Sequence, residues 1–234
     1  MTARILSFVP TALVALVFGF VGAMAFAASG LGGNATRAWL LEHPEVLPDM
    51  AQKLQQREAE TRLAGIGGDL TRPFPGAVLG NPNGTVTLVE FSDYGCTYCR
   101  HSVEDVKALV AADPNLRVVM REWPIFEGSD VPARMALAAA AQGKYAAFHD
   151  AMFAHGPPTP QSIEIAAKAA GLDLPAARAF MTSPQVEFEL ANNQNLARKL
   201  GFEGTPSWVA GKRVFSGAIG REGLEQAIAA AKEA

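Results

Sequence analysis

The chain has 234 residues, of which 49% are hydrophobic and 18% charged, and its formal net charge is −3 at pH 7. This length and composition are typical of a globular protein with one principal core, preceded by an appendage over residues 1–72. The slightly acidic balance argues against nucleic acid as a partner, because phosphate backbones select clustered positive charge.

Residues 1–28 are predicted to be a signal peptide or an N-terminal membrane anchor. Arg4 precedes an apolar run from Phe8 to Ala28. The sequence Ala25-Phe26-Ala27 fits a signal-peptidase site, whereas a run of this length also suffices to span a bilayer. We therefore expect export to the periplasm or another extracytoplasmic face, and the length of the run favours a retained anchor. A buried core helix is the alternative, but no polar face interrupts the run.

Residues 29–72 are predicted to form a tether and a helical extension. The glycine-rich stretch from Ser29 to Asn34 is typical of a flexible tether. A short helix is expected over 35–42 and a second one from Pro48 to about residue 63. The apolar side of the second helix is thin, so residues 35–63 are predicted either to pack on the following domain or to form a homo-oligomer.

Residues 73–234 are predicted to form an α/β domain, reached through a linker rich in Gly and Pro over 65–75. The order strand, helix, strand at its start indicates a βαβ unit with a parallel pair and a right-handed crossover. A helical insert without a convincing strand follows, over about 129–200. The other expected elements are strands at 85–91, 116–123, 207–210 and 213–215, and helices at 96–112 and 221–232.

The two cysteines of the chain are spaced as Cys96-Thr97-Tyr98-Cys99, between a predicted strand and a predicted helix. This arrangement is typical of a dithiol redox site, because the N-terminus of a helix favours a thiolate. Cys96 is therefore predicted to be the more acidic and the exposed thiol, which attacks. Cys99 lies about one helical turn further on, so we expect it to be partly covered and to resolve the mixed disulfide.

Three other kinds of site could use the two thiols. A zinc site would need two more ligands, but the four histidines are scattered and no second C-x-x-C exists, so no metal site is predicted. A purely structural disulfide would close only a very short loop and restrain little of the unfolded chain. A binding module that captures Cu(I) is the third alternative, since soft thiolates suit that ion. No nucleotide, flavin or metal motif is visible, and thiol exchange needs no cofactor.

Three motifs stand in an order and spacing that resembles the DsbA family of thiol:disulfide oxidoreductases: Phe91 to Arg100, Gly143 to His149, and Gly204 to Pro206. The resemblance covers about residues 73–232. It implies a thioredoxin fold with a helical insertion and a reversible disulfide between the two cysteines. The run from Leu40 to Leu47 is similar to the N-terminal segment of the ScsC-like subgroup, some members of which oligomerise through it.

The resemblance also implies roles for residues outside the C-x-x-C. In the family the peptide bond before the proline that matches Pro206 is cis and lies against the dithiol, which would expose the backbone of Thr205 for pairing with an extended client peptide. Thr97 and Tyr98 are the other expected substrate contacts. Glu90 matches the family's buried acid, which can relay the proton of the resolving thiol. The alternative is a solvent-facing Glu90 without a role.

Together these features predict an exported thiol:disulfide oxidoreductase that forms disulfides in client proteins with cysteines and is reset by a membrane redox partner. A disulfide isomerase or reductase of the same fold is the alternative direction of electron flow. It stays open because the family's imidazole between the cysteines is replaced here by Thr97 and Tyr98. Tyr145 and His149 are expected to be core residues rather than part of the chemistry.

Overall fold

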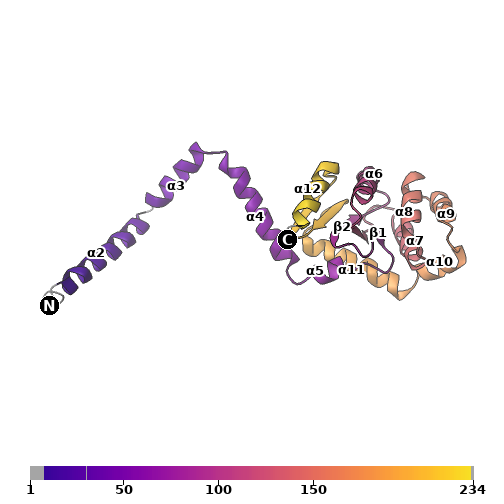
Figure 1. Cartoon of the computed structure of the whole chain (residues 1–234), viewed down its shortest axis with the longest axis horizontal. Helices are drawn as coiled ribbons and strands as arrows, with labels where there is room; N and C mark the ends of the chain where they lie inside the picture. Colours follow the sequence, from indigo (N-terminus) through magenta and orange to yellow (C-terminus); the bar gives the residue numbers. More distant parts are fainter. Residues whose placement is uncertain (1–7, 30, 233–234) are drawn as a thin grey trace. The chain divides into compact units, whose positions relative to one another are not determined.

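A computed structural model describes residues 8–29 and 31–232 of the chain (Figure 1). The chain divides into two compact units, Met1–Gln55 and Gln56–Ala234. The first unit holds helices α2 (Phe8–Ala28) and α3 (Leu31–Glu42) and most of α4 (Val46–Leu63). The flexible tether predicted over 29–34 is therefore wrong from Leu31 onward. Once a helix is nucleated, each added residue gains a hydrogen bond, which offsets the cost of the glycines.

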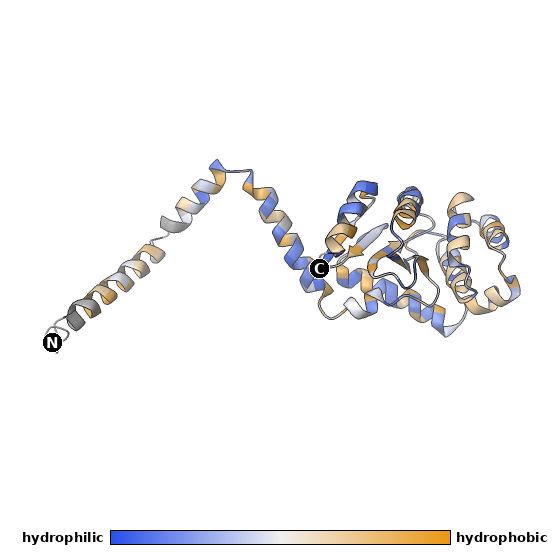
Figure 2. Cartoon of the chain, viewed as in Figure 1, coloured by the Kyte–Doolittle hydropathy of each residue, from blue (hydrophilic) through white to orange (hydrophobic). Residues whose placement is uncertain are grey.

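Helix α2 contains no charged residue and is drawn mostly in orange and pale colours in Figure 2, whereas α4 shows much more blue. Among the described residues, no helix is long and apolar enough to cross a membrane.

Helix α4 begins at Val46, two residues before the predicted start at Pro48. The proline is accommodated because the first backbone N–H groups of a helix have no partner within it. The last part of α4 belongs to the second unit. There Ala59 is buried, and Nη1 of Arg62 donates a hydrogen bond to the carbonyl oxygen of Leu200 at 3.2 Å.

The second unit is built on a five-stranded sheet of order β1-β3-β2-β4-β5. Strands β2 and β3 are parallel and the other neighbours are antiparallel, so the predicted βαβ unit is confirmed. Strand β1 was not predicted, because three residues are too short to show the alternation that reveals a strand. The strands are β1 (Val78–Gly80), β2 (Val86–Ser92), β3 (Leu116–Glu122), β4 (Ser207–Ala210) and β5 (Arg213–Ser216).

Alternation along β2 gives the sheet two different buried faces. Leu88 belongs to the core on one face, whereas Val89 and Phe91 belong to a second core on the other face. Helices α6 (Thr97–Ala112) and α12 (Gly220–Lys232) cover the first face, while α5 (Gly67–Thr71) and α11 (Pro184–Leu200) cover the second (Figure 1). Helix α5 falls inside the predicted linker over 65–75, and it forms because Leu70 is buried against the sheet.

The predicted helical insert is confirmed, and it lies beside one end of the sheet (Figure 1). Side-chain caps set several of its helix starts: Thr159 accepts the N–H of Ser162 in a capping box, and Asp173 caps the next helix. The helices of the insert are α7 (Asp130–Ala141), α8 (Tyr145–Ala154), α9 (Pro160–Ala169), α10 (Leu174–Met181) and α11.

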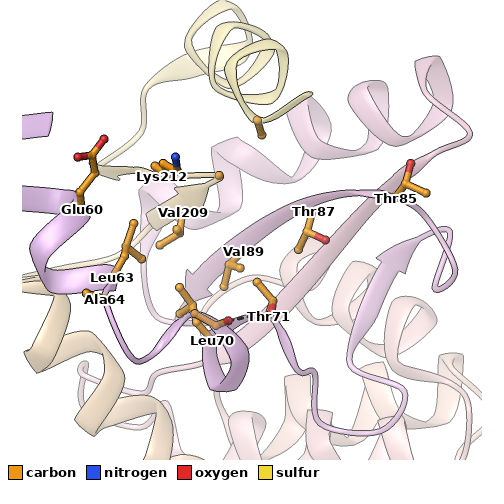
Figure 3. A pocket seen from close by; sticks show the side chains of 13 residues that line it. Glu60, Leu63, Ala64, Leu70, Thr71, Thr85, Thr87, Val89, Val209 and Lys212 are labelled. Atoms are coloured by element: carbon orange, nitrogen blue, oxygen red, sulfur yellow. Dashed lines mark hydrogen bonds between the residues drawn. The ribbon is translucent and has the colours of Figure 1, made fainter. Parts of the chain in front are cut away.

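A cavity of about 540 Å³ opens beside the second sheet face (Figure 3). Val89 and Val209 supply apolar surface from neighbouring strands, Leu70 adds more from α5, and Lys212 contributes an ammonium group. None of the residues that line this cavity belongs to the C-x-x-C, so it is separate from the dithiol.

Candidate dithiol active site

The loop that carries the dithiol runs from the end of β2 to the start of α6, and Asp93 holds it in place. One carboxylate oxygen, Oδ1, accepts the N–H of Gly95 at 2.6 Å. The other, Oδ2, accepts the N–H groups of Ile125 and Phe126 at 2.6 and 2.9 Å. Asp93 thus ties the dithiol loop to the segment that follows β3. Sequence reasoning missed this residue, because an aspartate after a strand usually indicates no more than a turn.

Glycine is required at position 95 because neighbouring atoms leave no room for a Cβ atom, and not because of an unusual backbone conformation. A Cβ atom at this position would lie 2.7 Å from Oγ of Ser129 and 3.0 Å from Cβ of Phe126. The N–H of Gly95 also donates to Oγ of Ser129 at 3.1 Å. The segment after β3 therefore packs directly against the turn that presents Cys96.

Cys96 is the N-cap residue of α6, and its Sγ accepts the N–H of Cys99 at 3.4 Å. The hydrogen bond from the Cys99 thiol is the main cause that lowers the pKa of Cys96 to about 5, and the Thr205 side chain and the backbone N–H groups at the helix start lower it further. The predicted acidity is confirmed. The predicted exposure is wrong, since Cys96 is only 4% exposed. It is covered because its thiol lies against the carbonyl oxygen of Thr205, at 3.2 Å.

Cys99 is fully buried one turn into α6. Burial raises the pKa of its thiol, and the hydrogen bond to Cys96 raises it further. Both cysteines are free thiols in this structure. The site therefore combines one thiol that ionises readily with a neighbour that keeps its proton. The two residues between them face outward, and Tyr98 is 63% exposed.

The Thr205–Pro206 peptide bond is cis, as expected. The loop is held by Ser207, whose Oγ donates to the carbonyl of Gly204 at 2.6 Å, and by the N–H of Gly217, which donates to the carbonyl of Pro206 at 2.8 Å. These bonds keep the backbone of Thr205 next to Cys96.

Glu90 is buried, so the solvent-facing alternative is wrong. In the alternation of β2 it lies on the sheet face of Leu88, which is also the face of the dithiol. Burial raises the pKa of Glu90 to about 8, and the nearby charge of Cys96 contributes to that rise. A carboxyl group with this pKa can accept or donate a proton near neutral pH.

A second buried carboxyl group, Glu122, lies on the same sheet face and was missed from the sequence. Its Oε1 accepts hydrogen bonds from the hydroxyls of Tyr145 at 2.5 Å and Tyr94 at 3.2 Å. The hydroxyl of Tyr94 also lies 3.3 Å from Nδ1 of His149, whose pKa is lowered to about 3 by burial. Tyr145 and His149 are buried as expected, but they belong to this polar cluster. The period of two along β3, which puts Glu122 on the face of Met120, was the available signal.

Among the described residues, no group of three or more His, Cys, Asp or Glu side chains could hold a metal ion. The chemistry of the site is that of two thiols, one acidic and one protected, above two buried carboxyl groups. Such an arrangement can exchange a disulfide with another molecule and move a proton.

Two family models match the chain. The model described as "Thioredoxin" matches residues 74–230, and the model described as "Copper resistance protein ScsC N-terminal domain" matches residues 35–60. The first covers the domain that carries the dithiol, and the second covers the segment that contains most of α3 and α4.

Solved structures give the same result. A thioredoxin-like oxidoreductase from Silicibacter pomeroyi is 46% identical, with a TM-score of 0.64 over 67% of this chain and 92% of that one. The thiol-disulfide exchange protein alpha-DsbA2 from Wolbachia pipientis is 27% identical, with a TM-score of 0.68 over 76% of this chain and 97% of that one. A periplasmic thioredoxin-like protein from Salmonella enterica is 25% identical, with a TM-score of 0.62 over 72% of this chain and 97% of that one.

Among curated proteins, the Na(+)/H(+) antiporter NhaA 1 of Salinispora arenicola is 29% identical over 158 residues, which make up 66% of this chain and 24% of the antiporter. The chain thus spans about a quarter of the length of that relative. The dithiol at the start of α6, the cis proline beside it and these matches agree. The chain belongs to the thioredoxin family, as a thiol:disulfide oxidoreductase of the DsbA and ScsC-like type.

Proposed function

We propose that this chain forms disulfides in exported client proteins by exchange at Cys96 and Cys99. The observation that carries the direction is the stabilised thiolate of Cys96, whose pKa is lowered to about 5 by the Cys99 thiol and the N–H groups of the helix start. Stabilising the reduced form makes the corresponding disulfide a stronger oxidant.

The proposed reaction starts from the Cys96–Cys99 disulfide. A client thiolate attacks Cys96, so that a mixed disulfide forms and Cys99 leaves as a thiolate, which takes a proton from Glu90. A second client thiolate then attacks the client sulfur and displaces Cys96. The client gains one disulfide, and its two electrons remain on the enzyme dithiol. In the reset, Cys96 attacks the disulfide of a membrane redox partner, Glu90 accepts the proton of Cys99, and Cys99 resolves the mixed disulfide.

The client is proposed to bind as an extended peptide beside the cis-proline loop. The carbonyl of Thr205 already lies against Cys96, so a strand that pairs with this backbone would bring its cysteine to the sulfur. Pro206 fixes the loop in that position, and Thr97 and Tyr98 supply exposed side chains next to Cys96 in the sequence. The exposed ring of Tyr98 offers apolar contact to many different sequences.

Export is supported by the apolar run of residues 8–28 and by the similarity to the Salmonella protein, which is described as periplasmic. Residues 35–63 are proposed to join copies of the chain. Their support is the match to the ScsC N-terminal domain and the exposure of apolar side chains, among them Leu41, Leu47 and Leu54.

The experiment is the equilibrium reduction potential of the dithiol, titrated against glutathione. An oxidant of client proteins should give about −120 to −160 mV, whereas about −250 mV or lower would favour the isomerase or reductase. The variant Cys99→Ala should trap client mixed disulfides at Cys96. A Cu(I)-binding module, the alternative from another class, would trap none.

A further inference from the structure

Three buried polar side chains form a row on the sheet face that carries the dithiol. Glu90 and Ser92 share this face because they alternate with Val89 and Phe91 along β2. Glu122 joins them, since the parallel register pairs it with Ser92. All three members of the row are buried. Buried titratable groups gathered beside a reactive centre are candidates for a functional role.

At one end of the row, two tyrosines bind one carboxylate oxygen of Glu122, and the other oxygen has no hydrogen-bond partner among the described residues. The hydroxyls of Tyr145 and Tyr94 both donate to Oε1 of Glu122. Oε2 of Glu122 is the oxygen without such a partner in the part of the chain that the structure describes, whereas the hydroxyl Oγ of Ser92 acts on Glu90, whose pKa it lowers. These two atoms belong to paired positions on neighbouring strands, and a serine hydroxyl can rotate toward either carboxyl group. The row is therefore polar along its length.

The other end of the row, Glu90, lies close enough to the dithiol for its charge to raise the pKa of the Cys99 thiol. Glu90 pairs with Met120, two residues before Glu122, so the two carboxyl groups stand diagonally across neighbouring strands. Their Cβ atoms are then about 7 Å apart, a separation at which like charges repel noticeably in a protein interior. Tyr94, which Glu122 binds, lies two residues before Cys96.

We propose that Glu122 is a positioning residue of the dithiol. Repulsion between the carboxylates of Glu122 and Glu90 sets the pH above which Glu90 is ionised and can accept the proton of Cys99. The inference rests on the proposed role of Glu90 in the reset. In that step, ionised Glu90 takes the proton of Cys99, and the Cys99 thiolate attacks the Cys96 sulfur of a mixed disulfide. The Cys96–Cys99 bond forms, and the bond to the partner breaks with its electron pair on the leaving sulfur.

Glu90 and Glu122 titrate in the same pH range, as the proposed repulsion between them requires. Burial raises the pKa of Glu122 to about 8, like that of Glu90, while hydrogen bonds from the two tyrosines act in the opposite direction. Each carboxylate opposes ionisation of the other, so the pair loses its protons in two coupled steps. The titratable groups that face Glu122 are Tyr94 and Asp93 from the dithiol loop, Tyr145 and His149 from α8, and Glu90 from β2.

The test follows resolution of a mixed disulfide between Cys96 and glutathione. Reduced protein is mixed with oxidised glutathione between about pH 6 and 10, quenched with acid and analysed by mass spectrometry. The wild-type rate should rise with pH as Glu90 ionises. In Glu122→Gln this rise should move to lower pH by about one unit, because no neighbouring carboxylate opposes Glu90. Glu225→Gln, the same change of charge at an exposed site, should keep the wild-type profile.

Tyr145→Phe keeps the proposal testable if Glu122→Gln does not fold. Loss of this hydroxyl favours the neutral form of Glu122, so the rise should again move to lower pH, by less than in Glu122→Gln. Profiles of both variants that coincide with the wild type would overturn the proposal. Glu90→Gln separates the two claims. If it abolishes the rise while the Glu122 variant changes nothing, only this inference is wrong; if it leaves the rise intact, the role of Glu90 is wrong and this inference is overturned with it.

Discussion

The Sγ atom of Cys96 lies 3.2 Å from the carbonyl oxygen of Thr205, although 109 residues separate the two in the sequence. They meet because β2 and β4 are antiparallel neighbours, with Phe91 paired to Ser207. The dithiol follows the end of one strand, and the cis-proline loop precedes the start of the other. The sheet register thus places the nucleophile beside the backbone of Thr205, with which the proposed client peptide would pair.

The acidity of Cys96 should depend on its neighbour. The first cause of its low pKa is the hydrogen bond from the Cys99 thiol, so Cys99→Ala should raise the pKa of Cys96 from about 5 toward its ordinary value. The thiolate absorbance near 240 nm, followed against pH, measures the change. Tyr98→Ala changes a side chain between the cysteines without touching this bond and serves as the control. An unchanged titration in Cys99→Ala would contradict the explanation.

Replacing Gly95 by alanine should destabilise the dithiol loop. The new Cβ would meet Oγ of Ser129 at 2.7 Å and Cβ of Phe126 at 3.0 Å. Overpacking of this kind costs about 1–3 kcal/mol, which urea denaturation can measure. The double variant Gly95→Ala with Ser129→Ala should recover part of the loss, because it removes the closest of these contacts. Additive effects of the two changes would show that the contact with Ser129 is unimportant.

A buried ion pair on the other face of the sheet offers a test of stability. Nη1 of Arg121 donates to Oε1 of Glu189 at 2.8 Å, and the guanidinium also binds the backbone carbonyls of Asp69, Leu70 and Arg72. Arg121→Met should cost about 3–5 kcal/mol in the free energy of unfolding, since it leaves a buried carboxylate unpaired. The double variant with Glu189→Gln should lose less than the sum of the single changes. A single variant as stable as the wild type would refute this account.

Glu90 should make the protein less stable as the pH rises. Its pKa is about 8 in the folded chain and 4.5 in the reference state, so its protonated form is favoured by folding. The unfolded state ionises first, and stability contributed by the protonated group falls between about pH 4.5 and 8. Glu90→Gln should therefore be more stable than the wild type near pH 8 and show a flatter dependence on pH. Thermal unfolding across this range checks the prediction, with Glu225→Gln as the exposed control.

The features of the fold and the site that could be predicted from the sequence are those that local sequence patterns specify. The dithiol, the proline loop and the long helices follow from local patterns, and the structure has them at or near the expected residues. Asp93 and Glu122 were missed, because their importance arises from contacts with residues distant in the chain. The exposure of Cys96 was misjudged for the same reason, since the loop that covers it precedes β4.

Asp93 links the dithiol turn to an exposed apolar segment of the surface. One carboxylate binds both Gly95, next to the reactive sulfur, and the backbone of Ile125 and Phe126, whose side chains are exposed. The turn and this apolar segment are therefore mechanically joined. A shift of the turn when the disulfide forms or opens would therefore also displace the exposed side chains of Ile125 and Phe126, so that opening and closing the disulfide would reshape an apolar surface outside the dithiol itself.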